Sequence, residues 1–413
     1  MNKEAPPLTL KLQRILKTDI HYLAKGGFWL VVGQIVSLFS LLFLSMFFAK
    51  KLPLETYGTY KYTLSLIGIF SSVSLTGIIT AVIQSTARGF EGFFLKSSKI
   101  YLKWSLPFFV LTVGGAIYYY IQGNMIIAGS LTVGAILNPI LQSFNFYSSF
   151  LSGRKDFKTN AFLSILKNVF ITVILITVLF TTKNIFILIV AYFLSHTTFN
   201  ACAYIYTITK YKPNKNLDGG ELTYTKHLSL MNILGTISMY IDSVLIFHFL
   251  GATQLAIYSF AVLIPEQIKG LLKVLTNLAL PKYSKNSLTA IKKTILYKMF
   301  IFGFFIIFII FVYNLAAPTI YHLLFPEYKS SILYSQIFAF SLIGIINILP
   351  MSALQGHGLI KELYKINMFF SLSKIVLLII LTPLYGIWGV ILSISIVRLL
   401  VPIVSYMLLY KKS

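Results

Sequence analysis

The feature that most constrains this chain is a succession of apolar segments, each long enough to cross a lipid bilayer. A transmembrane helix needs about 20 mostly apolar residues, and the sequence contains about twelve such segments. They are predicted at 27–49, 58–83, 101–121, 124–149, 160–182, 184–207, 226–249, 254–280, 294–316, 331–354, 362–382 and 385–409. Only 11% of the residues are charged, against about 25% in soluble domains. The sequence therefore predicts an all-α polytopic membrane protein.

The two halves of the chain carry traces of an internal repeat. The segment 52–60 (LPLETYGTY) recurs in degraded form at 250–258 (LGATQLAIY), and 151–154 (LSGR) is matched by 354–357 (LQGH). Membrane transporters are often built from two copies of one helical bundle, with the substrate site between them. We therefore expect an N-terminal six-helix bundle over 26–209, a linker over 210–225 and a C-terminal six-helix bundle over 226–413.

The distribution of basic residues predicts the orientation. Most of the 35 Lys and Arg residues lie in the N-terminal tail, the even-numbered loops and the C-terminal tail. By the positive-inside rule both termini are cytoplasmic. An even number of spans in each half makes the repeat parallel. Within the N-terminal segment 1–25, Leu and Ile recur at helical spacing among Lys and Arg, which predicts an amphipathic helix on the inner membrane face. The first apolar run is too long for a cleavable signal peptide.

Several classes of function are disfavoured by what the sequence lacks. The net charge of +24 would ordinarily suggest nucleic acid, but the basic residues are spread over short loops, so no nucleic-acid partner is expected. One cysteine, Cys202, permits no intramolecular disulfide. The 11 Asp and Glu form no paired carboxylates at helical spacing, and no HExxH, GxSxG or phosphate-binding glycine loop is present. We expect no enzyme activity, no metal site and no cofactor.

Acidic residues inside the spans need a reason, because burying a charge in the bilayer costs at least about 2.5–3.5 kcal/mol. Asp242 lies in the seventh span and shares a helical face with Asn232, which predicts a cavity-lining stripe. The alternative is an Asp that pairs with a neighbouring cation for structure only. Glu266 in the eighth span is three residues from Lys269, so mutual neutralisation is as good an explanation as a cavity.

Cations also lie deep in the spans. Lys167 and Lys374 occupy similar depths in the fifth and eleventh spans, and Arg398 lies near the middle of the twelfth, opposite His196 in the repeat. Arg398 cannot lose its charge, so it needs water, an acid or an anionic ligand. Together with Gln34, the repeat counterpart of Asn232, these cations are candidates for a cavity that binds a phosphate or pyrophosphate headgroup. The alternative is that each charge faces a different neighbour and no cavity is shared.

Several segments resemble a known family. They are 27–34 (GFWLVVGQ), 49–58 (AKKLPLETYG), 240–251 (YIDSVLIFHFLG), 257–261 (IYSFA) and 385–389 (YGIWG). They are similar to segments of oligosaccharide flippases, the polysaccharide biosynthesis export proteins of the MOP superfamily. That superfamily also contains the multidrug efflux (MATE) and lipid II flippase groups. The resemblance implies two six-helix bundles that alternate access to the two membrane faces. Of the family's charged positions, only Asp242 is matched here.

The resemblance and the charge pattern lead to one expectation about function. The chain is expected to be a flippase of the bacterial cytoplasmic (inner) membrane. It would move a polyprenyl-(pyro)phosphate-linked oligosaccharide for O-antigen or capsule export, beside polysaccharide polymerase and assembly proteins. Lys167, Lys374 and Arg398 would contact the headgroup, and Asp242 and Glu266 would couple transport to H⁺ or Na⁺. The alternatives are an ion-coupled multidrug exporter of the same fold and a non-transporting lipid-binding protein.

Overall fold

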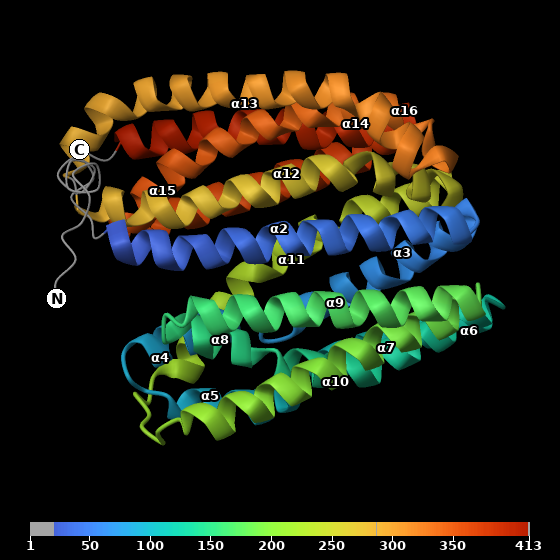
Figure 1. The fold of residues 1–413 in the computed structure, drawn as a ribbon, viewed down its shortest axis with the longest axis horizontal. Helices are drawn as coiled ribbons and strands as arrows, with labels where there is room; N and C mark the ends of the chain where they lie inside the picture. The colour runs from blue at the N-terminus through green and yellow to red at the C-terminus, as the bar shows by residue number, and fades with distance from the viewer. Residues whose placement is uncertain (1–19, 286, 412–413) are drawn as a thin grey trace, which may run out of the picture.

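The computed structural model describes residues 20–285 and 287–411, and these residues form helices joined by short turns (Figure 1). The predicted amphipathic segment over 1–25 lies mostly outside the described residues, and α2 has already begun at Ile20. The first half comprises α2 (Ile20–Lys51), α3 (Leu54–Phe70), η1 (Ser71–Val73), α4 (Ile78–Ala87), α5 (Gly92–Trp104), α6 (Leu106–Ile121), α7 (Met125–Phe144), α8 (Phe146–Gly153), α9 (Phe157–Thr181) and α10 (Ile185–Tyr211). The second comprises α11 (Glu221–Leu250), α12 (Ala252–Lys285), α13 (Leu288–Leu324), η2 (Pro326–Tyr328), α14 (Ser331–Ala339), η3 (Phe340–Asn347), α15 (Ile348–Gly356) and α16 (Ile360–Lys411).

These helices account for about twelve membrane crossings. Among the described residues, ten helices are long and apolar enough to span a membrane, and a bent pair, Leu54–Val73 with Ile78–Ala87, makes one more. The last helix, α16, is two spans. A Cβ on Gly389 would lie 1.9 Å from the carbonyl oxygen of Leu381, whereas eight residues of straight helix cover about 12 Å. The chain therefore reverses at Gly386, whose φ of +59° suits glycine.

Four predicted spans are interrupted in the structure, of which the third and fourth break only at Ser105 and Asn145. The second span bends by 61° between η1 and α4, at the point where Gly77 packs so closely on α11 that a Cβ would lie 2.6 Å from the carbonyl oxygen of Thr225. The tenth span changes from α14 to the 3₁₀ helix η3 and back to α15. Periodicity of apolar residues cannot reveal the breaks in the second and tenth spans, because tertiary contacts impose both.

The helices run side by side along the longest axis, with α11 and α3 passing between the outer layers (Figure 1). Within the first half α2 packs on α9, and α7 packs on α6 and α10. In the second half α16 packs on α11 and η3, and α12 packs on α14 and α15. Between the halves α3 contacts α11 and α12, and α2 contacts α12. The predicted domain boundaries stay a prediction, although the linker is shorter than expected because α10 ends at Tyr211 and α11 begins at Glu221.

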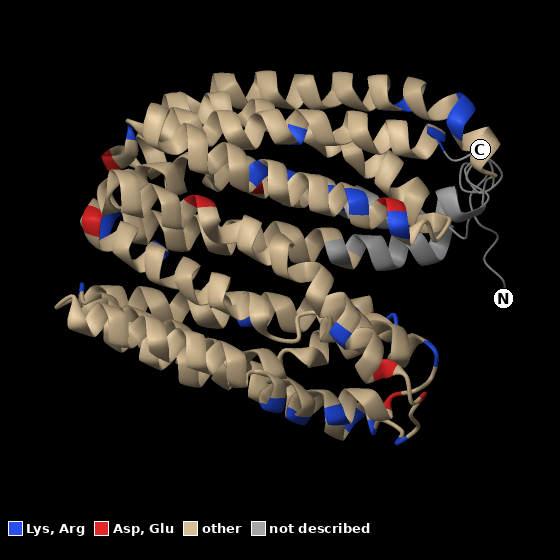
Figure 2. Cartoon of the chain, turned by 180° about the vertical axis from the view of Figure 1, so that it is seen from behind, with Lys and Arg blue, Asp and Glu red and all other residues tan. Residues whose placement is uncertain are grey.

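Charge is distributed unevenly between the two ends of the molecule. Figure 2 shows most Lys and Arg residues towards the end where α16 finishes, which we call the basic end. The other end, where α2 turns into α3 and α11 turns into α12, is called the opposite end. At the basic end the linker is tied to the first half: Asn214 donates its backbone N–H to Glu91 at 3.0 Å, and Arg88 pairs with Asp218 at 2.7 Å.

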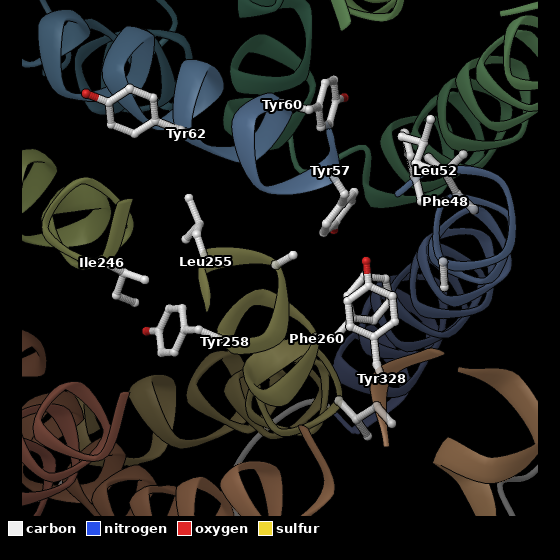
Figure 3. Packing of buried hydrophobic residues seen from close by; sticks show 14 of the residues in the cluster. Phe48, Leu52, Tyr57, Tyr60, Tyr62, Ile246, Leu255, Tyr258, Phe260 and Tyr328 are labelled. Atoms are coloured by element: carbon white, nitrogen blue, oxygen red, sulfur yellow. The ribbon is translucent and has the colours of Figure 1, made fainter. Parts of the chain in front are cut away.

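At the opposite end the two copies of the repeat contact each other. Gly58 of the first copy packs on Ala252 of the second, and a Cβ on Gly58 would lie 1.8 Å from the carbonyl oxygen of Ala252. Around this contact, Tyr57 lies 5.0 Å from Phe260, measured between ring centroids (Figure 3). Tyr62 stacks on Phe247 at 3.7 Å. The cluster also buries Leu52, Tyr60, Leu255 and Tyr258 (Figure 3). The two halves are therefore packed together at the opposite end.

Candidate functional site

Asp242 joins three helices of the second half. It lies on α11, and its Oδ2 accepts a hydrogen bond of 2.6 Å from the hydroxyl of Tyr258 on α12. The same oxygen lies 3.8 Å from Nζ of Lys374 on α16. Lys374 also donates to the backbone carbonyl of Ser238, one turn before Asp242. Both side chains of this ion pair are about nine-tenths buried, with 9% of Lys374 and 12% of Asp242 exposed.

Glu266 lies at the centre of a second network. It accepts hydrogen bonds from Nη2 of Arg398 and, at 2.9 Å, from Nζ of Lys269 one turn along α12. Nη1 of Arg398 donates to the Ser341 hydroxyl of η3 at 2.9 Å. The guanidinium also lies 5.2 Å from the centroid of the Phe338 ring. One carboxylate from α12 therefore faces two cations, one from α12 and one from α16.

The other predicted residues are less closely associated. Lys167 lies in the first half, where its Nζ is 3.4 Å from Oδ1 of Asn145. Gln34 on α2 reaches towards α12, since its Nε2 lies 3.0 Å from the position a Cβ on Gly270 would take. Asn232 is exposed on α11, about three turns before Asp242. The structure thus gathers Asp242, Glu266, Lys374 and Arg398 in the second half, while Lys167 belongs to the first.

Two residues that the sequence did not single out belong to these networks. Tyr258 binds Asp242, and Ser341 binds Arg398. Tyr258 carried a usable signal, because it is the repeat counterpart of Tyr60. Ser341 carried none, since a lone serine in an apolar span has no distinctive pattern.

Solved structures similar to this chain are transporters of the MOP superfamily. An outward-facing multidrug resistance MATE transporter has a TM-score of 0.67 and 14% identity, covering 97% of this chain and 99% of its own. The lipid II flippase MurJ in an inward closed conformation has a TM-score of 0.66 and 16% identity, covering 94% and 88%. A MOP superfamily transporter from Pyrococcus furiosus has a TM-score of 0.59 and 13% identity, covering 100% and 98%. The predicted fold class is confirmed: this chain has the MOP fold.

Comparison at the level of sequence gives the family. No curated protein matches this sequence. A family model described as polysaccharide biosynthesis protein matches residues 23–287, which run from within α2 to the end of α12 and include both copies of the 52–60 repeat. The predicted family is therefore confirmed. Since the match covers well over half of the chain, this multi-pass membrane protein belongs to the polysaccharide biosynthesis protein family.

Proposed function

We propose that this protein is a flippase of the bacterial cytoplasmic membrane. It moves an oligosaccharide linked to polyprenyl phosphate or pyrophosphate from the inner to the outer leaflet for surface polysaccharide synthesis. The observation that carries the proposal is the excess of cations over carboxylates within the spans of a member of the polysaccharide biosynthesis family.

The charges favour an anionic substrate. Asp242 and Glu266 face Lys374, Lys269 and Arg398, and Lys167 contacts the amide of Asn145. A cation within the bilayer that lacks a full counter-charge is costly. A phosphate or pyrophosphate headgroup would supply the missing negative charge, and Arg suits it because its planar fork of N–H donors matches phosphate oxygens. A cationic drug would instead meet a repulsive potential.

The packing at the opposite end supports alternating access. The contact of Gly58 with Ala252 and the surrounding aromatic rings hold the halves together there. In the proposed cycle, the headgroup and sugars enter between the halves from the basic, cytoplasmic end while the polyprenyl chain stays in lipid. The contact at the opposite end then opens to release them. A ligand drives such a change only through different affinities for the two states.

The carboxylates carry the proposed coupling to H⁺ or Na⁺. Each already binds a cation of the protein itself: Asp242 binds Lys374, and Glu266 binds Arg398 and Lys269. A coupling ion must therefore displace or neutralise a resident partner. Of the two, Asp242 is the better candidate, because it lies on α11, which packs on α3 of the first half as well as on α16 of the second.

Complementation of a flippase-deficient bacterium tests the proposal. The wild-type chain should restore surface polysaccharide, and Arg398→Ala and Asp242→Asn should abolish it even after export is normalised to the amount of protein in the membrane. Lys99→Gln removes a positive charge from an exposed position on α5 and serves as the matched control with full export. Because strains differ in their sugars, flippase-deficient hosts with several repeat-unit structures are needed. Tolerance to cationic drugs without any export would instead identify a multidrug exporter and refute the flippase.

A further inference from the structure

A cavity inside the second half holds several of the charged residues described above. It has a volume of about 450 Å³, is partly open to the surroundings, and is lined by α12, η3, α15 and α16. Ligand sites in proteins typically measure about 300–1,000 Å³. Its polar lining includes Lys269, Lys273, Arg398, Asn347, Asn367 and Gln355. The lining residues all come from the second half.

The charges in this cavity do not balance. Lys269 and Arg398 both bind Glu266, so one carboxylate serves two cations. Lys273 adds a third cation, one turn further along α12, and its side chain is exposed. The cations therefore lie at graded depths, from Arg398 near mid-membrane to Lys273 nearer the basic end. Such a series attracts an anion and guides it inwards.

One hydrogen-bond donor beside the cavity also lacks a partner. Nε of Arg398 is buried and has no hydrogen-bond partner among the described residues. Buried polar groups are normally paired, and a group that is not calls for an explanation such as a ligand or bound water. The guanidinium has five N–H donors, and its bonds to Ser341 and Glu266 leave the Nε donor without a partner.

The backbone at this cavity is unusual as well. η3 runs for 8 residues, Phe340–Asn347, whereas 3₁₀ runs longer than about 3–4 residues are uncommon and a 3₁₀ stretch within a helix often marks a functional hinge. Ser341, Gly344 and Asn347 of η3 line the cavity. A Cβ on Gly344 would lie 2.6 Å from the backbone oxygen of Arg398. The 3₁₀ turn thus brings the backbone of η3 against the helix that carries the arginine.

We infer that this cavity is a binding site for a phosphate or pyrophosphate group. Glu266 is the internal counter-ion that pairs with Arg398 and Lys269 when no ligand is bound. Arg398 and Lys269 exchange Glu266 for the ligand's oxygens, and Lys273 guides the ligand in. The exchange loosens the link between α12 and α16. The inference rests on the proposed function only for the ligand's natural source, which is either the headgroup of the transported lipid or an anionic bilayer lipid.

Inorganic pyrophosphate is the probe for the test. The full chain, purified in neutral detergent, is titrated with pyrophosphate by calorimetry and thermal unfolding, with sodium chloride at matched ionic strength as the reference. Binding to the folded state should raise the unfolding temperature in a saturable way. Lys273→Gln should weaken binding up to about fivefold, as expected for an exposed charge pair. Arg398→Lys should weaken it roughly tenfold or more, since hydrogen bonds between charged groups are lost.

Glu266→Gln gives the sharpest result, because it should tighten pyrophosphate binding by removing the internal competitor. A residue with a merely structural role would not do this. Lys99→Gln is the matched control and should bind like the wild type. No saturable binding above the chloride reference, or equal affinity in wild type, Lys273→Gln and Glu266→Gln, would overturn the inference.

Competition in nanodiscs distinguishes the two sources. If long-chain polyprenyl phosphate in phosphatidylcholine discs displaces pyrophosphate, the transported lipid is the ligand. If phosphatidylglycerol alone displaces it, the site binds a bilayer lipid. Export and binding are measured on the same variants. If the protein binds pyrophosphate but does not complement, the binding site is supported and the flippase function is refuted. If it complements but does not bind pyrophosphate, the flippase function is supported and the binding site is refuted.

Discussion

At the scale of single residues, the Asp242–Lys374 pair shows why a charge can persist inside a span. Its partners come from α11, α12 and α16, so each charge is held by groups far apart in sequence. Removing one partner from a buried pair leaves the other uncompensated and costs about 3–5 kcal/mol, whereas replacing both can be neutral. This asymmetry separates the pair's contribution to stability from its contribution to transport.

We therefore predict that Asp242→Asn and Lys374→Met each lower the thermal unfolding midpoint in detergent, by an amount that corresponds to about 3–5 kcal/mol. The double variant Asp242→Asn/Lys374→Met should recover most of this loss and still fail to export polysaccharide. Thermal unfolding and complementation measure the two effects. If the stability losses of the two single variants add in the double variant, the two side chains do not act as a pair. If the double variant exports polysaccharide fully, Asp242 does not couple transport to an ion.

A second prediction at this scale concerns Asp156, which lies outside the spans at the start of α9. Its carboxylate accepts hydrogen bonds from the backbone N–H of Thr159, the Thr159 hydroxyl and the Tyr211 hydroxyl. Burial acts to raise the pKa of Asp156, but these hydrogen bonds outweigh it and lower the pKa below its usual value of 3.8. The stabilisation is therefore present above the unfolded pKa and is lost as pH falls through the folded pKa.

Asp156→Ala should reduce stability at pH 7 by about 1 kcal/mol, the usual value of a helix N-cap. The difference from wild type should shrink as the pH falls below about 4. Thermal unfolding at several pH values measures it. The matched control is Asn184→Ala, which removes the N-cap of α10 without a titrating group and should show a pH-independent difference. If the stability difference between Asp156→Ala and wild type were also independent of pH, the stabilising role of the ionised Asp156 carboxylate would be contradicted.

Residue types and spacing allowed only part of the candidate site to be predicted. Asp242, Glu266 and Arg398 were detectable because charges in apolar spans are rare and costly. Which of these residues pair with which was not detectable, apart from Glu266 with Lys269, which is one turn away on the same helix. The pairings of Lys374 with Asp242 and of Arg398 with Glu266 depend on how α16 packs against α11 and α12. One sequence contains no record of that packing.

At the scale of helices, the repeat has a structural meaning that the sequence did not show. Its two copies, 52–60 and 250–258, pack against each other where α3 meets α12. The recurring Tyr, Leu and small residues therefore describe a contact surface as well as a duplication. Small residues let the helix backbones approach closely, as is common at helix interfaces in membranes.

Gly58 tests whether this contact governs the conformational change. Even Gly58→Ala places a Cβ within 1.8 Å of the carbonyl oxygen of Ala252, so the variant should disfavour closure of the opposite end. Gly114→Ala on α6 meets nothing within 4 Å and is the matched control. Spin labels on cysteines at Glu55 and Thr253, in a Cys202→Ser background, report the separation of the halves. Gly58→Ala should lengthen this distance and Gly114→Ala should not; unchanged distances in both would exclude a gate here.

At the scale of the whole molecule, the unequal charge of the two ends determines how the chain sits in the membrane. The fold class and the positions of most spans followed from hydropathy alone, because the bilayer permits little else than helices that satisfy their own backbone hydrogen bonds. The bend before α4 and the 3₁₀ stretch η3 could not be predicted, since both depend on neighbouring helices. Orientation depends on a different property, the excess of Lys and Arg at the basic end (Figure 2).

The last prediction is that the basic end faces the cytoplasm, as the positive-inside rule requires. Alkaline phosphatase fused after Lys411 should be inactive and green fluorescent protein there should fluoresce, because phosphatase folds only outside the cytoplasm. A phosphatase inserted at the turn of Gly123 and Asn124, at the opposite end, should be active. Replacing Lys96, Lys99 and Lys103 of α5 by Gln should leave this orientation unchanged, since the other basic loops still favour it. Active phosphatase at Lys411 would show that the basic end faces away from the cytoplasm. The proposed entry of substrate from the basic end would then be wrong.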